Sequence, residues 1–158
     1  MFYILYGQDD FSLNQAVEKI KAGLGDWEMV ATNTTNLEGQ HLTLSELRNK
    51  CDAAPFLSSH RLVIVDGLLG RFEVQQSRPR SGRGKSGNGL GEWEGLASYI
   101  KQMPETTVLV LVDGEVQGQN PLLKKLSSSA EVRTFPLLRG RDLKAWIRQR
   151  VKKEGGDI

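Results

Sequence analysis

The sequence predicts a doubly wound α/β fold, in which helices cover both faces of a mostly parallel sheet. Two continuous apolar runs, at 61–66 and 107–113, are typical of strands that are buried on both faces. Segments with helical periodicity separate the apolar runs, so successive strands need crossover connections and pair in parallel. With 158 residues, the chain is long enough for one such domain with a substantial core. We expect this domain to fill residues 1–136.

The first half of the chain supplies the elements that open the domain. Residues 2–6 predict a buried strand, and apolar periodicity over 11–24 predicts a helix. Residues 27–32 are expected to form a second strand. Thr43 and Glu46 have the spacing of a capping box, which predicts a helix running to about Cys51.

The second half alternates in the same way. Residues 96–103 are helical by periodicity, Asn120 and Pro121 have the pattern of a helix start, and residues 131–135 predict the last strand. Pro136 and Gly140 then break the pattern, and residues 142–151 predict an amphipathic helix with basic residues on one face. We expect residues 137–158 to hold the first helix of a second, truncated helical domain.

Composition narrows the functional class only a little. A net charge of +2 does not by itself indicate a nucleic-acid partner, although basic residues cluster at 78–85 and 139–153. Cys51 is the single cysteine, so an internal disulfide is excluded and a reducing cytoplasm is expected. The chain contains neither a signal-peptide pattern nor an apolar run of membrane-spanning length, so no membrane association is expected.

The turn after the first strand stands where a nucleotide-binding domain holds phosphate. A working P-loop needs several glycines, a lysine for the phosphate charge and a hydroxyl for magnesium. The stretch Gly7, Gln8, Asp9 and Asp10 has one glycine and no lysine. A carboxylate from the chain itself can occupy the helix N-terminus instead. We interpret this turn as a degenerate phosphate loop and expect no cofactor.

No other segment restores a catalytic site. Gly84, Lys85 and Ser86 resemble the end of a P-loop, but Pro79 occupies the position of its first glycine. Asp66 and Asp113 end strands without the glutamate that a hydrolytic site needs, so they are expected to form turns. His41 and His60 lack metal-ligand spacing and a neighbouring nucleophile, so no metal site and no catalytic residue are predicted.

Residues 74–92 are rich in glycine, arginine and serine, which predicts a flexible insertion. Its cations could contact DNA phosphates as a basic strap, or the segment could be a surface insertion without a defined role. The candidate DNA contacts are Arg78, Arg80, Arg83 and Lys85.

Pro55, Phe56 and Leu57 form the one candidate binding motif. Two large apolar residues follow a proline at a helix-to-strand junction, where a fold leaves side chains at the rim of a sheet. Such a pair can fill a pocket on a partner protein. The alternative is that Phe56 turns inward and closes the core, and the residues alone favour neither.

Four stretches in order resemble the delta subunit family of bacterial DNA polymerase III. They are residues 6–11 with the helix that follows, residues 55–58 leading into 61–65, residues 107–111, and residues 143–147. The resemblance spans the chain apart from roughly 74–92. It implies an AAA+-like first domain that does not bind ATP, followed by a helical lid domain.

The resemblance also implies a function as a clamp-loader subunit that binds and opens the sliding clamp for loading on primed DNA. Phe56 and Leu57, with Pro55 beside them, correspond to the apolar pair that enters a pocket on the clamp. The implied partners are the clamp and, through the full-length chain, the gamma/tau and delta-prime subunits, with DNA contacted indirectly. The subunit would belong to a polymerase assembly without catalysing a reaction. The alternatives are a nucleotide-binding enzyme of P-loop type, which predicts nucleotide affinity, and a DNA-binding module acting through the basic insertion.

Overall fold

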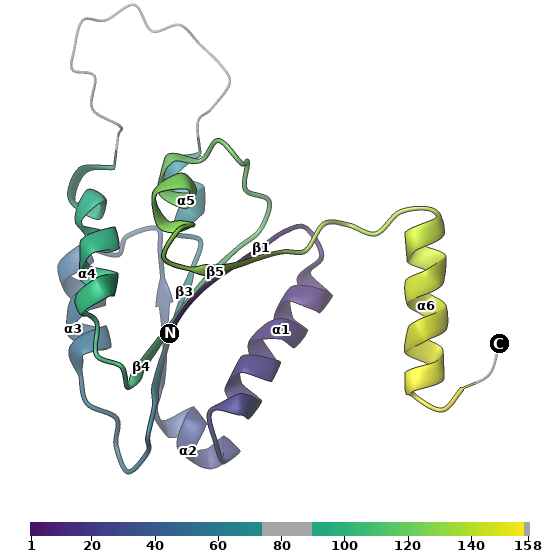
Figure 1. The fold of residues 1–158 in the computed structure, drawn as a ribbon, viewed down its shortest axis with the longest axis horizontal. Coiled ribbons are helices and arrows are strands. Elements are labelled where there is room, and N and C mark those ends of the chain that lie inside the picture. Colours follow the sequence, from purple (N-terminus) through teal and green to yellow (C-terminus); the bar gives the residue numbers. More distant parts are fainter. Residues whose placement is uncertain (74–89, 157–158) are drawn as a thin grey trace, which may run out of the picture.

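The computed structural model describes residues 1–73 and 90–156 of the chain. Its sheet has five parallel strands in the order β2-β3-β4-β1-β5 (Figure 1). The strands are β1 (Phe2–Tyr6), β2 (Thr34–Glu38), β3 (Arg61–Asp66), β4 (Thr107–Asp113) and β5 (Glu131–Thr134). Parallel pairing throughout confirms the doubly wound fold class.

Helices cover both faces of this sheet (Figure 1). On one face lie α1 (Asp10–Gly23) and α2 (Trp27–Thr32), and on the other α3 (Leu44–Asp52), α4 (Leu96–Gln102) and α5 (Pro121–Leu126). Two short 3₁₀ helices, η1 (Leu69–Phe72) and η2 (Gly91–Gly95), pack on the second face, and α6 (Arg141–Lys153) follows the sheet.

Strand β4 shows why this architecture has two cores. Val108 and Val110 pack with α1 and α2, whereas Leu109 and Leu111 pack with the helices of the opposite face. All four side chains are fully buried. Because neighbouring residues of a strand point to opposite faces, a strand buried on both faces needs an uninterrupted apolar run, as predicted.

Local capping fixes the helix starts that the sequence predicted. The Thr43 side chain accepts a hydrogen bond from the Glu46 N–H, and the Glu46 carboxylate accepts one from the Thr43 N–H. Asn120 Oδ1 accepts from the N–H groups of the next turn, ahead of proline at the first helical position. Both predicted caps are therefore confirmed.

The expected strand at 27–32 is wrong, because this segment is helix α2. The strand follows it, at Thr34–Glu38, and pairs only with β3 at the edge of the sheet. An edge strand is only partly buried, so its sequence can be polar and gives little strand signal. In α2 only Val30 is buried, while Trp27 and Met29 face solvent. Alternating apolar residues at 27 and 29 therefore resemble a half-buried strand although neither is part of the core.

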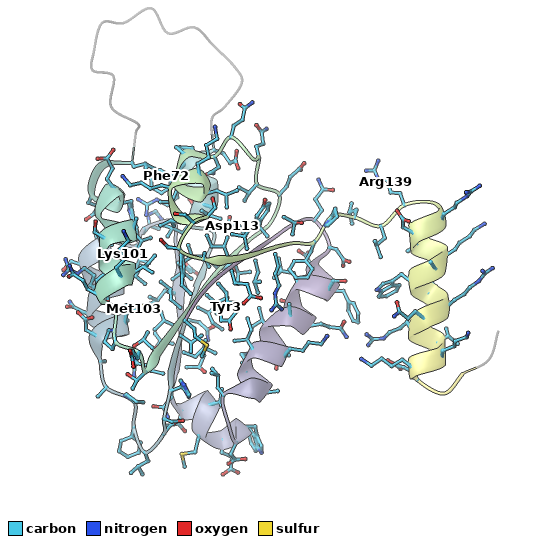
Figure 2. All side chains as sticks on the ribbon, viewed as in Figure 1. Tyr3, Phe72, Lys101, Met103, Asp113 and Arg139 are labelled. Carbon is cyan, nitrogen blue, oxygen red and sulfur yellow. The ribbon has the colours of Figure 1, made fainter. Side chains whose placement is uncertain are left out.

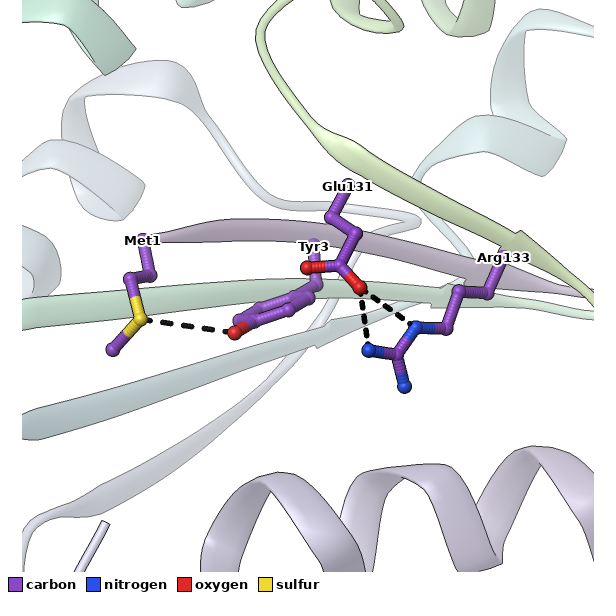
Figure 3. Close-up of polar contacts among 4 residues, drawn as sticks. All are labelled: Met1, Tyr3, Glu131 and Arg133. Carbon is purple, nitrogen blue, oxygen red and sulfur yellow. Dashed lines mark hydrogen bonds and ion pairs between the residues drawn. The ribbon is translucent and has the colours of Figure 1, made fainter. Parts of the chain in front are cut away.

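The opposite edge of the sheet, β5, carries charged side chains. Glu131 and Arg133 form an ion pair along the strand, and the Arg133 guanidinium lies over the ring of Tyr3 on neighbouring β1 (Figure 3). Tyr3 Oη also lies 3.7 Å from the sulfur of Met1. Charge on an edge strand discourages pairing with another chain.

Helix α6 follows the last strand and lies beyond α1 as seen from the sheet (Figure 1). Its side chains meet α1 through Phe11, whose ring packs edge-to-face on Trp146 at a centroid distance of 6.0 Å. The Arg150 guanidinium also lies 5.0 Å from the Phe11 ring centroid. Arg139 lies at the turn into α6 (Figure 2). The helix expected at 142–151 is thus present, and its assignment to a second domain stays a prediction.

Candidate functional site

Residues 53–60, which we call the anchor loop, join α3 to β3 and carry the most exposed apolar pair of the described chain. The Phe56 side chain is 64% exposed and Leu57 is 77% exposed. Pro55 beside them is half-buried. The alternative that Phe56 turns inward to close the core is therefore wrong. Since single exposed apolar residues are common, the adjacency of these two is the informative feature.

The anchor loop lies at the amino-terminal edge of the sheet, because β3 begins directly after it. Helix α2 lies at the same end of the molecule (Figure 1). The Gly7 turn follows β1 and so lies at the carboxyl-terminal edge, where ligands of parallel α/β sheets usually bind. The structure therefore does not bring together the two predicted sets of site residues.

A buried asparagine holds the backbone of the anchor loop. Asn33 follows α2 and is 1% exposed. Its Oδ1 accepts a hydrogen bond of 2.6 Å from the Phe56 N–H, and its Nδ2 donates one of 2.9 Å to the Phe56 carbonyl. Asn33 could not be identified from the sequence, since its partner is 23 residues away and no local pattern signals the contact.

Leu57 has a backbone conformation that side chains rarely adopt. Its φ of +51° makes it the one non-glycine residue with positive φ in the described part of the chain. A left-handed conformation costs a residue with a Cβ roughly 1–2 kcal/mol, so the surrounding structure must impose it. Such outliers cluster at binding sites, which adds a second observation at the anchor loop.

The Gly7 turn is closed by the chain itself. The Gly7 N–H donates to the Gly114 carbonyl at 2.8 Å, and the Asp9 N–H donates to the Phe135 carbonyl at 3.0 Å. A Cβ on Gly7 would lie only 2.1 Å from the Phe135 oxygen, so the backbone after β5 fits closely over the turn. Two N–H groups that a phosphate would need are thus already bonded.

Asp9 occupies the start of α1 as the sequence indicated. Its Oδ1 accepts from the Ser12 N–H at 3.1 Å, and its Oδ2 accepts from the Ser12 hydroxyl at 2.6 Å. Gln8 lies in the turn, and Asp10 is the first residue of the helix. Both acidic residues therefore lie at the end of the helix that carries partial positive charge, and the Asp9 carboxylate is bonded to it.

Asp113 ends β4 and is buried at the same edge (Figure 2). Its carboxylate accepts hydrogen bonds from the N–H groups of Leu69 and Gly70, at 2.8 and 3.2 Å. Burial raises the pKa of Asp113 to about 6, and these two hydrogen bonds oppose the rise. The side chain thus fastens η1, whose two donors are 44 and 43 residues away in sequence, to the end of the neighbouring strand β4, instead of forming the turn after its own strand as expected.

The candidate DNA contacts Arg78, Arg80, Arg83 and Lys85 lie outside the described residues. Residues 90–92 of the expected insertion do have defined structure, since Leu90 is buried and η2 begins at Gly91. The high content of glycine, arginine and serine in this segment gave no indication that Leu90 would be buried.

None of the described helices combines the length and apolar character needed to cross a membrane.

Two solved structures share this fold. The Bacillus subtilis DNA clamp loader delta protein matches with a TM-score of 0.72 and 21% identity, over 97% of this chain and 43% of that one. A Thermotoga maritima protein related to the DNA polymerase III gamma subunit matches with a TM-score of 0.53 and 13% identity, over 94% and 45%. The chain therefore spans less than half the length of either. No curated protein matches the chain.

The family comparison covers most of the sequence. A model described as DNA polymerase III, delta subunit, matches residues 3–135, which include the anchor loop and all five strands of the sheet except the first residue of β1. The match covers three of the four stretches that carried the resemblance, at 6–11, 55–65 and 107–111, whereas the fourth, at 143–147, lies beyond it. The chain belongs to the DNA polymerase III delta subunit family.

Proposed function

We propose that the chain acts as a clamp-loader delta subunit, which binds the ring-shaped sliding clamp and favours its open form for loading on primed DNA. Phe56 and Leu57 would enter a pocket on the clamp, with Pro55 beside them. The observation that carries the proposal is the exposure of this adjacent pair on a loop whose backbone is pinned by buried Asn33. Large apolar side chains on an ordered loop make efficient interface anchors.

The mechanism requires no chemistry in this chain. A protein that binds the open clamp more tightly than the closed clamp shifts the equilibrium toward the open form by the ratio of the two affinities. The Gly7 turn supports a non-hydrolytic role. Its N–H groups at Gly7 and Asp9 are bonded to carbonyls of the chain and are therefore not free to bind a nucleotide phosphate. This geometry, like the absent lysine, disfavours the alternative of a P-loop enzyme.

Assembly with the gamma/tau and delta-prime subunits, and indirect contact with DNA, are proposals for the longer protein, since the chain covers 43% of the Bacillus subtilis delta protein. Membership of such a complex would place the protein in the cytoplasm. Direct DNA binding through Arg78, Arg80, Arg83 and Lys85 stays a prediction. It would appear as steeply salt-dependent DNA affinity that is lost when residues 74–89 are deleted.

The decisive experiment measures the affinity of the chain for the sliding clamp of its own organism before and after Phe56→Ala. We expect the substitution to weaken binding by about 2 kcal/mol or more, as for a hot-spot anchor, which is roughly 30-fold in Kd. Phe11→Ala is a matched control, because Phe11 is also a half-exposed phenylalanine (50%) but lies in the first turn of α1, at the other edge of the sheet, where it contacts Trp146 of α6 and not the anchor loop. Equal affinities for Phe56→Ala and Phe11→Ala would contradict the proposal.

A further inference from the structure

We propose that Asn33 is the positioning residue of the anchor loop: it fixes the backbone of Phe56 and thereby sets how Phe56 and Leu57 are presented to a partner. The inference rests on the proposed clamp-binding role of that pair and adds a residue that does not touch the clamp. Asn33 is 1% exposed, so any effect it has on binding must act through the loop.

The hydrogen bonds of Asn33 join three elements. Its side-chain Nδ2 donates to the carbonyls of both Met29 and Phe56, at 2.8 and 2.9 Å, and its Oδ1 accepts from the Phe56 N–H. Its backbone carbonyl accepts from the Leu62 N–H at 3.0 Å, at the start of β3. Asn33 therefore ties the end of α2, the anchor loop and the sheet to one another.

Few other restraints hold the tip of the loop. In the described part of the chain, the two bonds with Asn33 are the only hydrogen bonds that join residues 55–58 to another element. The bonds among Ser58, Ser59 and His60 are local to the loop. Because Phe56 and Leu57 are largely exposed, packing contributes little to fixing their backbone. Asn33 is thus the main determinant of the loop conformation.

A pinned loop and a free loop would differ in apparent affinity even if they made identical contacts with the clamp. When only a fraction of molecules holds the binding-competent conformation, the apparent Kd rises in inverse proportion to that fraction. Removing two hydrogen bonds and their bidentate geometry should reduce the competent fraction to about a tenth. The strained φ of Leu57 makes this loss larger, because an unpinned Leu57 relaxes to a more common conformation.

The test compares Asn33→Ala with Thr34→Val in clamp binding. Thr34 is the matched control, since its hydroxyl donates to the Val30 carbonyl at 2.6 Å, at the same end of α2, and this hydrogen bond does not involve the anchor loop. We expect Asn33→Ala to raise the Kd for the clamp about tenfold. Thr34→Val should leave it within about twofold. Amide hydrogen exchange provides the independent readout: the Phe56 amide should exchange faster in Asn33→Ala, while the amides of β3 and β4 keep their protection.

A double variant separates positioning from general loss of structure. In the Phe56→Ala background, Asn33→Ala should weaken binding much less than in the unmodified chain, because the loop then presents only Leu57. Equal weakening in both backgrounds would overturn the inference, as would an unchanged Kd in Asn33→Ala. If Phe56→Ala alone leaves the Kd unchanged, the proposed function fails first, and the positioning role fails with it.

If Asn33→Ala does not fold completely, Asn33→Asp replaces it in the binding test. The aspartate keeps an acceptor for the Phe56 N–H but turns a carboxylate oxygen toward the carbonyls of Met29 and Phe56. Protonation restores one donor at that position. The Kd of Asn33→Asp relative to the unmodified chain should therefore fall as the pH is lowered. A ratio that does not change with pH would contradict positioning by these hydrogen bonds.

Discussion

Gly7→Ala tests whether the carboxyl-terminal edge of the sheet depends on a close approach of two backbones. Gly7 has a φ of +150°, and an added Cβ would lie 2.1 Å from the Phe135 oxygen and 2.4 Å from its carbonyl carbon. Both neighbours are backbone atoms, so no side-chain rotation relieves the contact. The chain after β5 must therefore move away from β1.

The magnitude follows from what that movement breaks. Phe135 donates to the Tyr6 carbonyl at 2.8 Å and accepts from the Asp9 N–H at 3.0 Å. Losing both hydrogen bonds costs about 2 kcal/mol, and the backbone strain of alanine at this φ adds roughly 1 kcal/mol. We expect a loss of ~3 kcal/mol or more in the free energy of unfolding, which corresponds to a fall of roughly 6–12 °C in Tm.

Urea unfolding followed by far-ultraviolet circular dichroism measures this change. Gly118→Ala is the control, since Gly118 has no positive φ and no atom within 4 Å of an added Cβ. Its free energy of unfolding should stay within about 0.5 kcal/mol of the unmodified chain. If Gly7→Ala and Gly118→Ala unfold at the same urea concentration with equal slopes, the close approach of Gly7 to Phe135 does not contribute to stability.

Two further predictions concern buried titratable groups. Burial raises the pKa of Asp113 from its ordinary value of 3.8 to about 6, so the native state binds more protons between these values and the free energy of unfolding falls as the pH rises through that window. Relative to Asp113→Asn, the unmodified chain should lose up to roughly 3 kcal/mol from pH 3.5 to 7, and a pH-independent difference between the two would be evidence against this shift. Cys51 is fully buried and its pKa is raised to about 12, mainly by burial, so Ellman's reagent at pH 8 should label it more than ~100-fold more slowly in the native than in the denatured chain. Comparable labelling rates in the native and denatured chains would show that α3 separates from the sheet often enough to expose Cys51.

The elements that sequence patterns predicted well are those whose signals are local or doubly buried. Strands β3 and β4 are packed on both faces, so each needs the continuous apolar run that identified it. The capping box of Thr43 and the Asn120 cap depend on residues two to three positions away, which a pattern can capture. The parallel sheet then followed from the alternation of strands and helices.

The elements that were missed depend on contacts distant in sequence. Helix α2 has one buried residue, Val30, and its exposed apolar residues imitate a strand. Strand β2 is recognised only by its pairing with β3. The position of Phe56 could not be predicted either, because its backbone is bonded to Asn33, 23 residues away, and the closure of the Gly7 turn involves Phe135, which also lies far away in the sequence.

The two edges of the sheet therefore differ in a way that bears on function. At the carboxyl-terminal edge, where parallel α/β folds usually bind ligands, the carbonyls of Gly114 and Phe135 accept from the N–H groups of Gly7 and Asp9, and the Asp9 carboxylate accepts from the Ser12 N–H of α1. At the amino-terminal edge, two large apolar side chains stay exposed on a loop that Asn33 holds. Folding alone gains little from leaving Phe56 and Leu57 in water or from the positive φ of Leu57. A binding role for the anchor loop accounts for both features, whereas a role confined to the Gly7 turn accounts for neither.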